Sequence, residues 1–236
     1  MRVTEYRLRG PIRKRIVLLA DIHGDPMNTE LVERQEPELI AIAGDLQTVK
    51  SGEGLRKETL ELLAGLRRIA PTFYALGNHE TRLTPGDCRR VRETGTELLE
   101  DRWVPFDDLL VGGLSSASRR RFMKGTAQRE PLTPDLDFAG RFAAEKGYKL
   151  LICHHPEYYD WYLRELDIDL VLSGHAHGGQ IRLFGQGLYA PGQGLFPKRT
   201  KGVYDGRLVV SAGMANTGGI IPRLFNPTEL VAVTIE

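Results

Sequence analysis

Two histidines one residue apart, His175 and His177, follow the apolar run 170–172 and lie among glycines. An apolar run that ends at glycine is typical of a buried strand followed by a loop. Two imidazoles at i and i+2 on such a loop can face one point, and imidazole is a common ligand of divalent metals. The pair alone is equally compatible with surface histidines in a glycine-rich turn, so a metal site needs further ligands from elsewhere in the chain.

Four other apolar runs end at polar turns that carry side chains of the kind that bind metals. We expect these runs, at 16–20, 39–43, 72–76 and 148–153, to be buried strands of an α/β fold. The carboxyl ends of such strands share one edge of a sheet, where ligands bind. The five turns therefore predict one pocket with these candidate ligands: Asp21, His23, Asp45, Asn78, His154, His175 and His177.

These oxygen and nitrogen ligands are too many for one tetrahedral zinc ion. They suit two divalent ions about 3.5–4 Å apart with one bridging carboxylate. Mixed Asp, Asn and His ligation predicts two divalent metal ions, manganese in the first place, with iron or zinc as alternatives. Packing alone does not explain why all five turns carry such side chains.

Helical patterns separate the expected strands. Apolar periodicity and helix-start signals predict helices over 26–35, 54–69, 85–94, 133–146 and 157–165. Thr133 is expected to cap the helix that starts at Pro134. Further strands are expected at 2–8, within 97–114, at 168–172, and near 203–205, 207–212 and 229–235. The strands of the tail are expected to form a second, more antiparallel half.

Composition places the chain among ordinary water-soluble proteins. Its 236 residues fit one domain, 1–236, with 41% hydrophobic and 27% charged residues. The net charge of +1 makes nucleic acid an unlikely partner, and no apolar stretch approaches the length of a transmembrane segment. Cys88 and Cys153 are far apart, which fits a reducing compartment. No signal peptide is evident at the N-terminus, so we expect a cytoplasmic protein.

The order of the motifs resembles that of the calcineurin-like metallophosphoesterase superfamily. The motifs, which cover residues 16–180, are Asp-x-His at 21, Gly-Asp at 44, Gly-Asn-His at 77, His-x-Pro at 154 and Gly-His-x-His at 174. Residues 174–180, Gly185, Tyr189-Ala190-Pro191 and Pro222-Arg223 are similar to one branch of small bacterial phosphodiesterases. That branch is related to UDP-diacylglucosamine pyrophosphatases and to cell-wall-associated metallophosphoesterases.

The resemblance implies a four-layer α-β-β-α sandwich, with two mixed sheets flanked by helices. It also implies that one metal is bound by Asp21, His23 and His177, and the other by Asn78, His154 and His175. Asp45 is implied to bridge the metals, and His79 to lie beside the scissile phosphate without binding metal. His155 falls on the variable position of His-x-Pro and is not included. The chain departs from the common pattern in two places. Many relatives have a second Asp shortly after Gly-Asp, whereas the run here is Gly44-Asp45-Leu46-Gln47-Thr48, and Glu80 follows Gly-Asn-His in place of Asp.

The expected activity is metal-dependent hydrolysis of a phosphodiester or pyrophosphate. Two metals make hydroxide available near neutral pH and offset charge during in-line displacement. His79, oriented by its neighbour Asp45, would stabilise that charge or protonate the leaving oxygen. The expected partner is a small phosphoester, including nucleotide- and lipid-linked ones; the oligomeric state is not readable from the sequence.

Other readings stay open or are excluded by motif order. A phosphomonoesterase of the same fold and a non-catalytic binding scaffold both stay open. A metallo-β-lactamase-like hydrolase would need His-x-His-x-Asp-His, which the chain lacks. An amidohydrolase would have His-x-His after the first strand, where this chain has Asp21-x-His23. The basic segment 119–124 is expected either to be a solvated surface loop or to be a flap for an anionic or lipid-like substrate.

Overall fold

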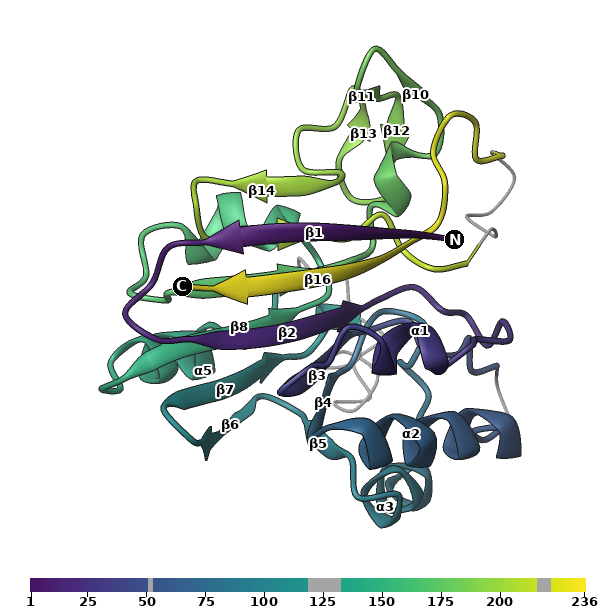
Figure 1. Ribbon diagram of the computed structural model, residues 1–236, viewed down its shortest axis with the longest axis vertical. Coiled ribbons are helices and arrows are strands. Elements are labelled where there is room, and N and C mark those ends of the chain that lie inside the picture. The colour runs from purple at the N-terminus through teal and green to yellow at the C-terminus, as the bar shows by residue number, and fades with distance from the viewer. Residues whose placement is uncertain (51–52, 119–132, 216–221) are drawn as a thin grey trace.

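The computed structural model describes residues 1–236 except 51–52, 119–132 and 216–221. The described residues form two six-stranded mixed sheets packed face to face, with helices on the outer faces (Figure 1). This is the expected four-layer α-β-β-α arrangement. The basic segment 119–124 lies outside the described residues.

The first sheet has the order β1-β16-β2-β3-β4-β5. Its strands are β1 (Arg2–Leu8), β16 (Glu229–Ile235), β2 (Lys14–Leu19), β3 (Leu39–Ala43), β4 (Thr72–Ala75) and β5 (Glu97–Leu99). The second sheet has the order β14-β15-β9-β8-β7-β6. Its strands are β14 (Gly202–Tyr204), β15 (Leu208–Val210), β9 (Leu170–Ser173), β8 (Tyr148–Cys153), β7 (Leu109–Leu114) and β6 (Arg102–Phe106).

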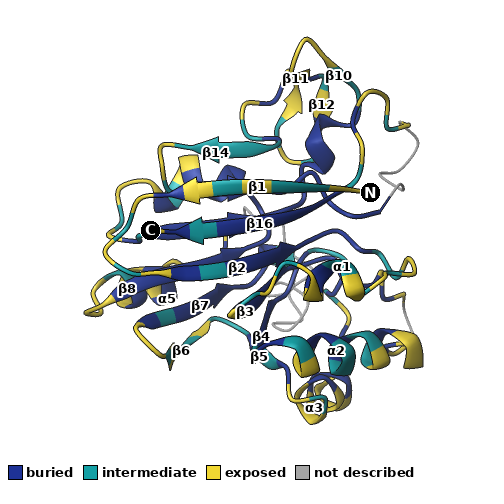
Figure 2. Ribbon diagram, viewed as in Figure 1, coloured by how far each residue is buried: buried dark blue, intermediate teal, exposed yellow. Residues whose placement is uncertain are grey.

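The central strands are apolar on both faces because both faces are covered. In β2, Ile16 and Leu18 pack between the sheets, whereas Val17 and Leu19 pack against the helices of the first sheet. The strands of the second sheet alternate in the same way. Continuous apolar runs are therefore expected here, rather than the polar–apolar alternation of a half-exposed strand. Figure 2 shows these strands largely buried, with exposed residues along the outward side of α2.

Helices α1 (Glu30–Glu33), α2 (Lys57–Ile69) and α3 (Pro85–Glu93) cover the first sheet. Helix α5 (Leu136–Ala143) and the π-helical turn η1 (Tyr159–Leu163) cover the second. A capping box starts α3, because Thr84 Oγ1 accepts from the backbone of Asp87 and the Asp87 side chain accepts from the backbone of Thr84. None of the described helices combines the length and the apolar character that crossing a membrane would need.

Several helices are shorter than predicted. The helix expected over 54–69 begins at Lys57, and the segment expected over 157–165 is the π-helical turn Tyr159–Leu163. The helix expected over 26–35 is the single turn α1, because Asn28 Oδ1 accepts from the backbone N–H of Glu30 and starts the helix later. Helix α5 is capped by Asp135 rather than Thr133: its Oδ1 accepts from the backbone N–H of Phe138 at 3.0 Å. A carboxylate three residues before an unpaired N–H satisfies that donor directly, which Thr133 is too far away to do.

The tail does not form a separate, more antiparallel half, as the sequence had suggested. Strand β16 pairs in parallel with β1 and antiparallel with β2, so it completes the first sheet. Strands β14 and β15 instead extend the second sheet beside β9. Two small hairpins also project beyond the sheets, at the top of Figure 1. They consist of β10 (Arg182–Leu183) with β11 (Gln186–Gly187), and β12 (Tyr189–Ala190) with β13 (Gly194–Leu195).

Candidate metal centre

The candidate ligands all lie in the loops that follow five strands. Strands β2, β3 and β4 are parallel neighbours in the first sheet, so their carboxyl ends lie side by side. Strands β8 and β9 are parallel neighbours in the second sheet. Because the two sheets pack face to face, three loops of one sheet meet two loops of the other. The structure therefore brings the seven candidate ligands together at the carboxyl ends of these strands, where the sequence led us to expect them.

Hydrogen bonds join these loops within and between the sheets. The backbone N–H of His23 donates to Asp45 O at 2.9 Å, linking the first two loops. His154 Nδ1 lies 2.7 Å from Ala43 O, so this ring reaches from the second sheet to the first. The backbone N–H of His175 donates to Asp21 Oδ2 at 3.0 Å. An Nδ1–H held by a carbonyl leaves His154 Nε2 as the nitrogen that can bind a metal.

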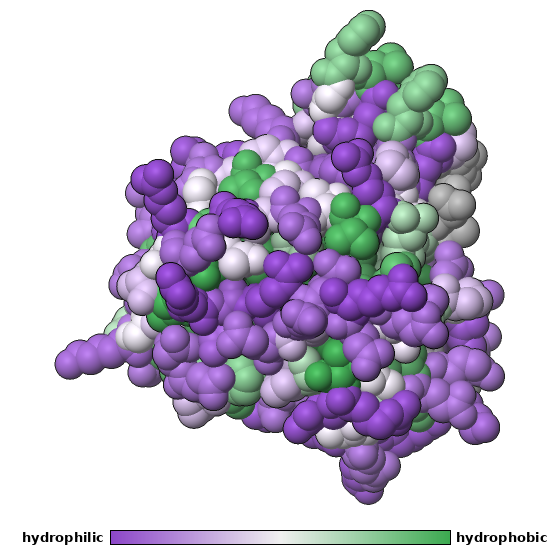
Figure 3. Space-filling view, viewed as in Figure 1, coloured by the Kyte–Doolittle hydropathy of each residue, from purple (hydrophilic) through white to green (hydrophobic). Residues whose placement is uncertain are grey.

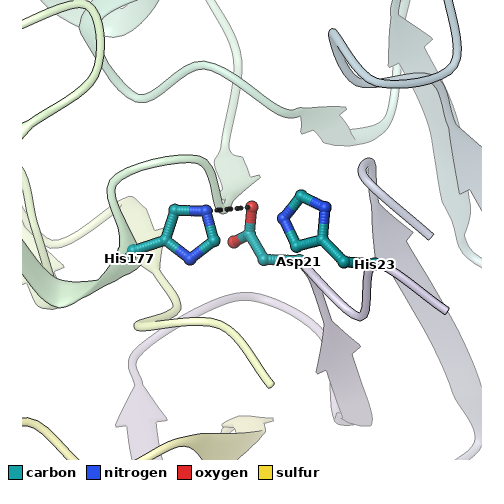
Figure 4. A group of neighbouring side chains, drawn as sticks. All are labelled: Asp21, His23 and His177. Carbon is teal, nitrogen blue, oxygen red and sulfur yellow. Dashed lines mark ion pairs between the residues drawn. The ribbon is translucent and has the colours of Figure 1, made fainter. Parts of the chain in front are cut away.

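Asp21, His23 and His177 form the first group of potential ligands. One ligand atom from each lies within 4.8 Å of the others, and the His177 Nε2–Asp21 Oδ1 distance is 3.6 Å. Figure 4 shows the two imidazoles on either side of the Asp21 carboxylate. His23 Nε2 and His177 Nδ1 are buried without a hydrogen-bond partner among the described residues. Buried polar atoms are normally paired, so these orphaned nitrogens fit a metal ion.

Asp45, His154 and His175 form a second group, also within 4.8 Å. His154 Nε2 lies 3.2 Å from Asp45 Oδ2 and 3.1 Å from His175 Nδ1. The amide oxygen of Asn78 is 3.1 Å from the same nitrogen. Oxygen and nitrogen lone pairs that converge in a buried space repel one another unless a cation lies among them. The donor set therefore fits a divalent ion of borderline character.

Asp45 lies between the two groups. Its Oδ2 is 3.2 Å from His154 Nε2 in the second group and 3.9 Å from His23 Nε2 in the first. Asp45 Oδ1 accepts from the backbone N–H of His79 at 2.9 Å. Asp45 is thus the carboxylate that faces imidazoles of both groups.

Burial keeps most of these imidazoles neutral, the form that binds metals. Burial lowers the pKa of His23, lowers that of His177 to about 4, and lowers that of His175 well below its ordinary value. His154 behaves differently: burial lowers its pKa, but Asp45, the charge of Asp21 and the carbonyl of Ala43 together outweigh burial and raise it to about 10. A buried carboxylate needs a positive partner, which a proton on His154 supplies in the metal-free protein.

The backbone of the site is strained. Five candidate ligands have positive φ angles of 45–64°: Asp21, His23, Asp45, His175 and His177. Residues other than glycine rarely adopt this conformation, and each such residue costs about 1–3 kcal/mol. Strain shared by five side chains that point into one space is typical of a functional site, because packing alone gives no reason to maintain it.

His79 differs from the candidate ligands in its exposure and its partner. Its side chain is 39% exposed, whereas the side chains of His23, His154, His175 and His177 are at most 9% exposed. Its Nδ1 lies 2.9 Å from Thr48 Oγ1, and its Nε2 lies 3.8 Å from Asp45 Oδ2. Thr48 therefore makes the hydrogen bond that orients the ring, a role that the sequence interpretation gave to Asp45. Thr48 stands out in the sequence only as part of the run after Asp45 that departs from the family motif.

Glu80 is a second residue whose role the sequence did not reveal. Its buried carboxylate accepts backbone N–H groups from Asp45 at 2.9 Å, Gln47 at 3.2 Å and Gly77 at 2.7 Å. It thereby joins the loops after β3 and β4. Burial, and then the nearby charge of Asp45, raise the pKa of Glu80 to about 7. Its position after Gly-Asn-His was the only signal in the sequence.

His155 and Glu157 both lie next to His175 of the second group. Glu157 Oε1 lies 3.1 Å from His155 Nδ1 and 3.8 Å from His175 Nε2. His155 Nε2 is 2.8 Å from Ser116 Oγ, so both ring nitrogens of His155 have partners. His155, Glu157 and His175 also have ligand atoms within 4.8 Å of one another, so the omission of His155 from the ligand set stays a prediction. A carboxylate near the far nitrogen of a ligating histidine fixes the ring and increases its basicity.

Gly77 is required where the loops after β3 and β4 come closest. A Cβ at this position would lie 2.2 Å from Asp45 Oδ1 and 2.7 Å from the Asp45 backbone nitrogen. We therefore expect Gly77→Ala to displace Asp45, to weaken Mn²⁺ binding at least about tenfold, and to destabilise the protein by about 1–3 kcal/mol. Calorimetric Mn²⁺ titration and thermal unfolding measure the two effects.

Gly65→Ala in α2 is the matched control. A Cβ there would meet nothing closer than 3.7 Å, and alanine stabilises a helix by about 1 kcal/mol relative to glycine. The control is expected to bind Mn²⁺ like the unmodified protein. Equal Mn²⁺ affinity of Gly77→Ala and Gly65→Ala would show that Asp45 does not depend on this close approach.

Several known proteins are similar to this chain. The family model for calcineurin-like phosphoesterases matches residues 14–179, well over half of the chain. An uncharacterized metallophosphoesterase of Campylobacter jejuni is 28% identical over 94% of this chain, which spans 59% of that protein. One from Aquifex aeolicus is 26% identical over 94% of this chain and 85% of its own length. Among solved structures, the phosphopantetheinyl hydrolase of Mycobacterium tuberculosis aligns at 14% identity with a TM-score of 0.47, covering 85% of this chain and 90% of that one.

Proposed function

Because the chain belongs to the calcineurin-like phosphoesterase family, we propose that it hydrolyses a phosphodiester or pyrophosphate at a centre of two divalent metals. The coarser activity, metal-dependent hydrolysis of a phosphoester, follows from the family. Asp21, His23 and His177 would hold one metal, Asn78, His154 and His175 would hold the other, and Asp45 would be shared by both. Manganese is the proposed metal, and the cytoplasm the proposed location.

The position of Asp45 is the observation that carries the proposal. Its Oδ2 lies within 4 Å of imidazole nitrogens from both ligand groups. One carboxylate shared in this way holds two cations at the short separation that phosphoester hydrolysis uses. A single-metal site would give no reason for both groups to surround this side chain.

The chain's own residues contribute the remaining chemistry. Two divalent ions at the site would supply a water of lowered pKa and offset negative charge on the phosphate. His79, the most exposed imidazole of the cluster, is available to a substrate, and Thr48 orients it. It would hydrogen-bond a phosphate oxygen or give a proton to the leaving oxygen. Glu80 keeps the backbone of the two contributing loops fixed.

A cavity next to the second ligand group favours a substrate with a second substituent on phosphorus. The cavity has a volume of about 570 Å³, and Glu157, which contacts His175, lines one side of it. Arg164, Lys198 and Arg199 also line it. Asp160 lines the cavity as well and pairs with Arg199, while Arg164 pairs with Asp205. Lys198 is therefore the lining cation that has no ion pair among the described residues and is left for a substrate. A cavity of this size suits the second half of a diester or pyrophosphate better than a bare monoester. A phosphomonoesterase remains the alternative activity, and a binding scaffold the alternative class.

Metal-stripped protein with Mn²⁺ added back tests the proposal. We expect no turnover without metal, and Mn²⁺-dependent hydrolysis of bis-p-nitrophenyl phosphate faster than that of p-nitrophenyl phosphate. Preference for the monoester would support the phosphatase alternative. Two bound metals per chain without turnover of either compound would favour the binding scaffold.

A further inference from the structure

Three phenylalanines are presented to solvent by an unusual backbone. Phe184, Phe196 and Phe225 have relative exposures of 108%, 69% and 80%. Their φ angles are 50°, 51° and 55°, in the left-handed region. Bulky residues seldom adopt this conformation, and an aromatic ring that stays exposed does not gain the free energy of burial. Both features are unfavourable, and both occur at all three positions. We therefore expect these phenylalanines to contact another molecule.

These rings and the leucine that precedes each of them lie in hairpins and loops at one end of the molecule, and we call this set the aromatic face. It consists of Leu183, Phe184, Leu195, Phe196, Leu224 and Phe225, all of them exposed. A cavity of about 390 Å³ lies between Phe184 and Phe225. Figure 3 shows hydrophobic side chains gathered at the top of the molecule, over the hairpins β10–β13 of Figure 1. Exposed apolar side chains gathered in this way mark an interaction site.

The segments that carry the aromatic face are strongly basic. Residues 178–201 and 222–226 contain no acidic residue. Their basic residues are Arg182, Lys198, Arg199, Lys201 and Arg223. Arg199 is paired with Asp160 and Asp205, and Lys201 with Glu229. Arg182, Lys198 and Arg223 form no ion pair within the described part of the chain, so they leave net positive charge at this end of the molecule, although the whole chain has a net charge of only +1. Exposed apolar side chains flanked by cations are complementary to a surface that has anionic headgroups over an apolar layer.

We propose that the aromatic face docks on an anionic lipid bilayer, with the phenylalanine rings at the boundary between headgroups and acyl chains. Aromatic rings on separate loops insert singly into a bilayer without needing a complementary protein groove. The face is also tied to the metal centre. Arg182 donates to Gly178 O at 2.7 Å, and Asn226, next to Phe225, donates to His177 O at 2.7 Å. Docking would therefore place the loop of His175 and His177 close to the lipid surface. The proposal goes beyond the proposed hydrolysis and does not depend on it.

Sedimentation with vesicles tests this proposal. We expect the protein to bind vesicles of phosphatidylcholine and phosphatidylglycerol in equal parts, more weakly at high salt, and more weakly still when the vesicles lack phosphatidylglycerol. The triple variant Phe184→Asn, Phe196→Asn and Phe225→Asn should bind at least about tenfold more weakly. Asparagine tolerates the left-handed backbone, so the thermal midpoint of the variant should not fall.

Two further variants make the test specific. Leu136→Asn removes an exposed apolar side chain on α5, which lies far from the hairpins in Figure 1, and should bind like the unmodified protein. Lys198→Glu, at an exposed position, should weaken binding to the anionic vesicles severalfold, and it tests the proposal even if the triple variant does not fold. Undiminished binding by the triple variant, or absence of binding by the unmodified protein, would overturn the proposal. Concentration-dependent self-association that the triple variant abolishes would assign the face to a contact between copies of the chain.

Discussion

His79→Ala is expected to lower the turnover of bis-p-nitrophenyl phosphate by roughly 10²–10⁴ while both metals stay bound. The reason is the position of the ring. Its side chain is 39% exposed, so a substrate can reach it, whereas the candidate ligands are almost fully buried. Its Nε2 lies 3.8 Å from Asp45 Oδ2, so the ring would lie beside a phosphate bound to metals that Asp45 would help to hold. Removing the ring deletes a proton or charge partner without removing a candidate ligand.

The measurements are the turnover number with saturating Mn²⁺ and the metal content of the purified protein. Thr48→Val is the matched variant, because it removes the 2.9 Å hydrogen bond to His79 Nδ1 and leaves the ring in place. It also removes the longer contact of 3.4 Å to His23 Nδ1, so the metal content of this variant is measured as well. We expect it to lower turnover by about tenfold, the effect of losing one orienting hydrogen bond. Loss of metal in His79→Ala would show that the ring is a ligand after all. Turnover of His79→Ala close to that of the unmodified protein would remove His79 from catalysis.

The strands and the ligand loops were predictable because the chemistry is local in sequence. A strand that is buried on both faces must be a continuous apolar run, as Ile16–Leu19 and Leu39–Ala43 are. A ligand loop must then begin where the run ends, and parallel strands bring such loops to one edge. These two constraints suffice to gather residues from Asp21 to His177 without knowledge of the strand order.

The supporting contacts were not predictable because they join residues that the sequence keeps apart. Nothing near Glu80 shows that its carboxylate accepts from the backbone of Asp45 and Gln47, more than 30 positions away. The insertion of β16 between β1 and β2 was hidden for the same reason, since strand pairing over more than 200 residues leaves no local pattern. The cap of α5 is a different case: Thr133 and Asp135 are both good cap residues, and only the backbone decides between them.

Asp45→Asn is expected to abolish hydrolysis and to weaken Mn²⁺ binding in both ligand groups at once. The amide keeps the size of the side chain but removes the charge that faces His154 and His23. A carboxylate shared by two cations supports both, so its loss should lower the bound metal from two ions per chain to one or none. Metal analysis after gel filtration measures this, with Asp137→Asn at an exposed position of α5 as the matched control. Two tightly bound metals in Asp45→Asn would rule out the bridging role.

The same substitution should change how the stability of the metal-free protein depends on pH. Although burial lowers the pKa of His154, Asp45 and its other polar neighbours raise it to about 10 in the folded chain, above its ordinary value of 6.5. A pKa raised by folding contributes stability that is fully present below the unfolded value and is lost as the pH rises through the folded value. The metal-free protein should therefore lose stability between about pH 6.5 and 10, and Asp45→Asn, which lacks the carboxylate, should lose less over the same range. Urea unfolding of both proteins with a metal chelator present measures the difference. Parallel pH profiles would mean that His154 carries no proton when the metals are removed, and that another group balances the buried charge of Asp45.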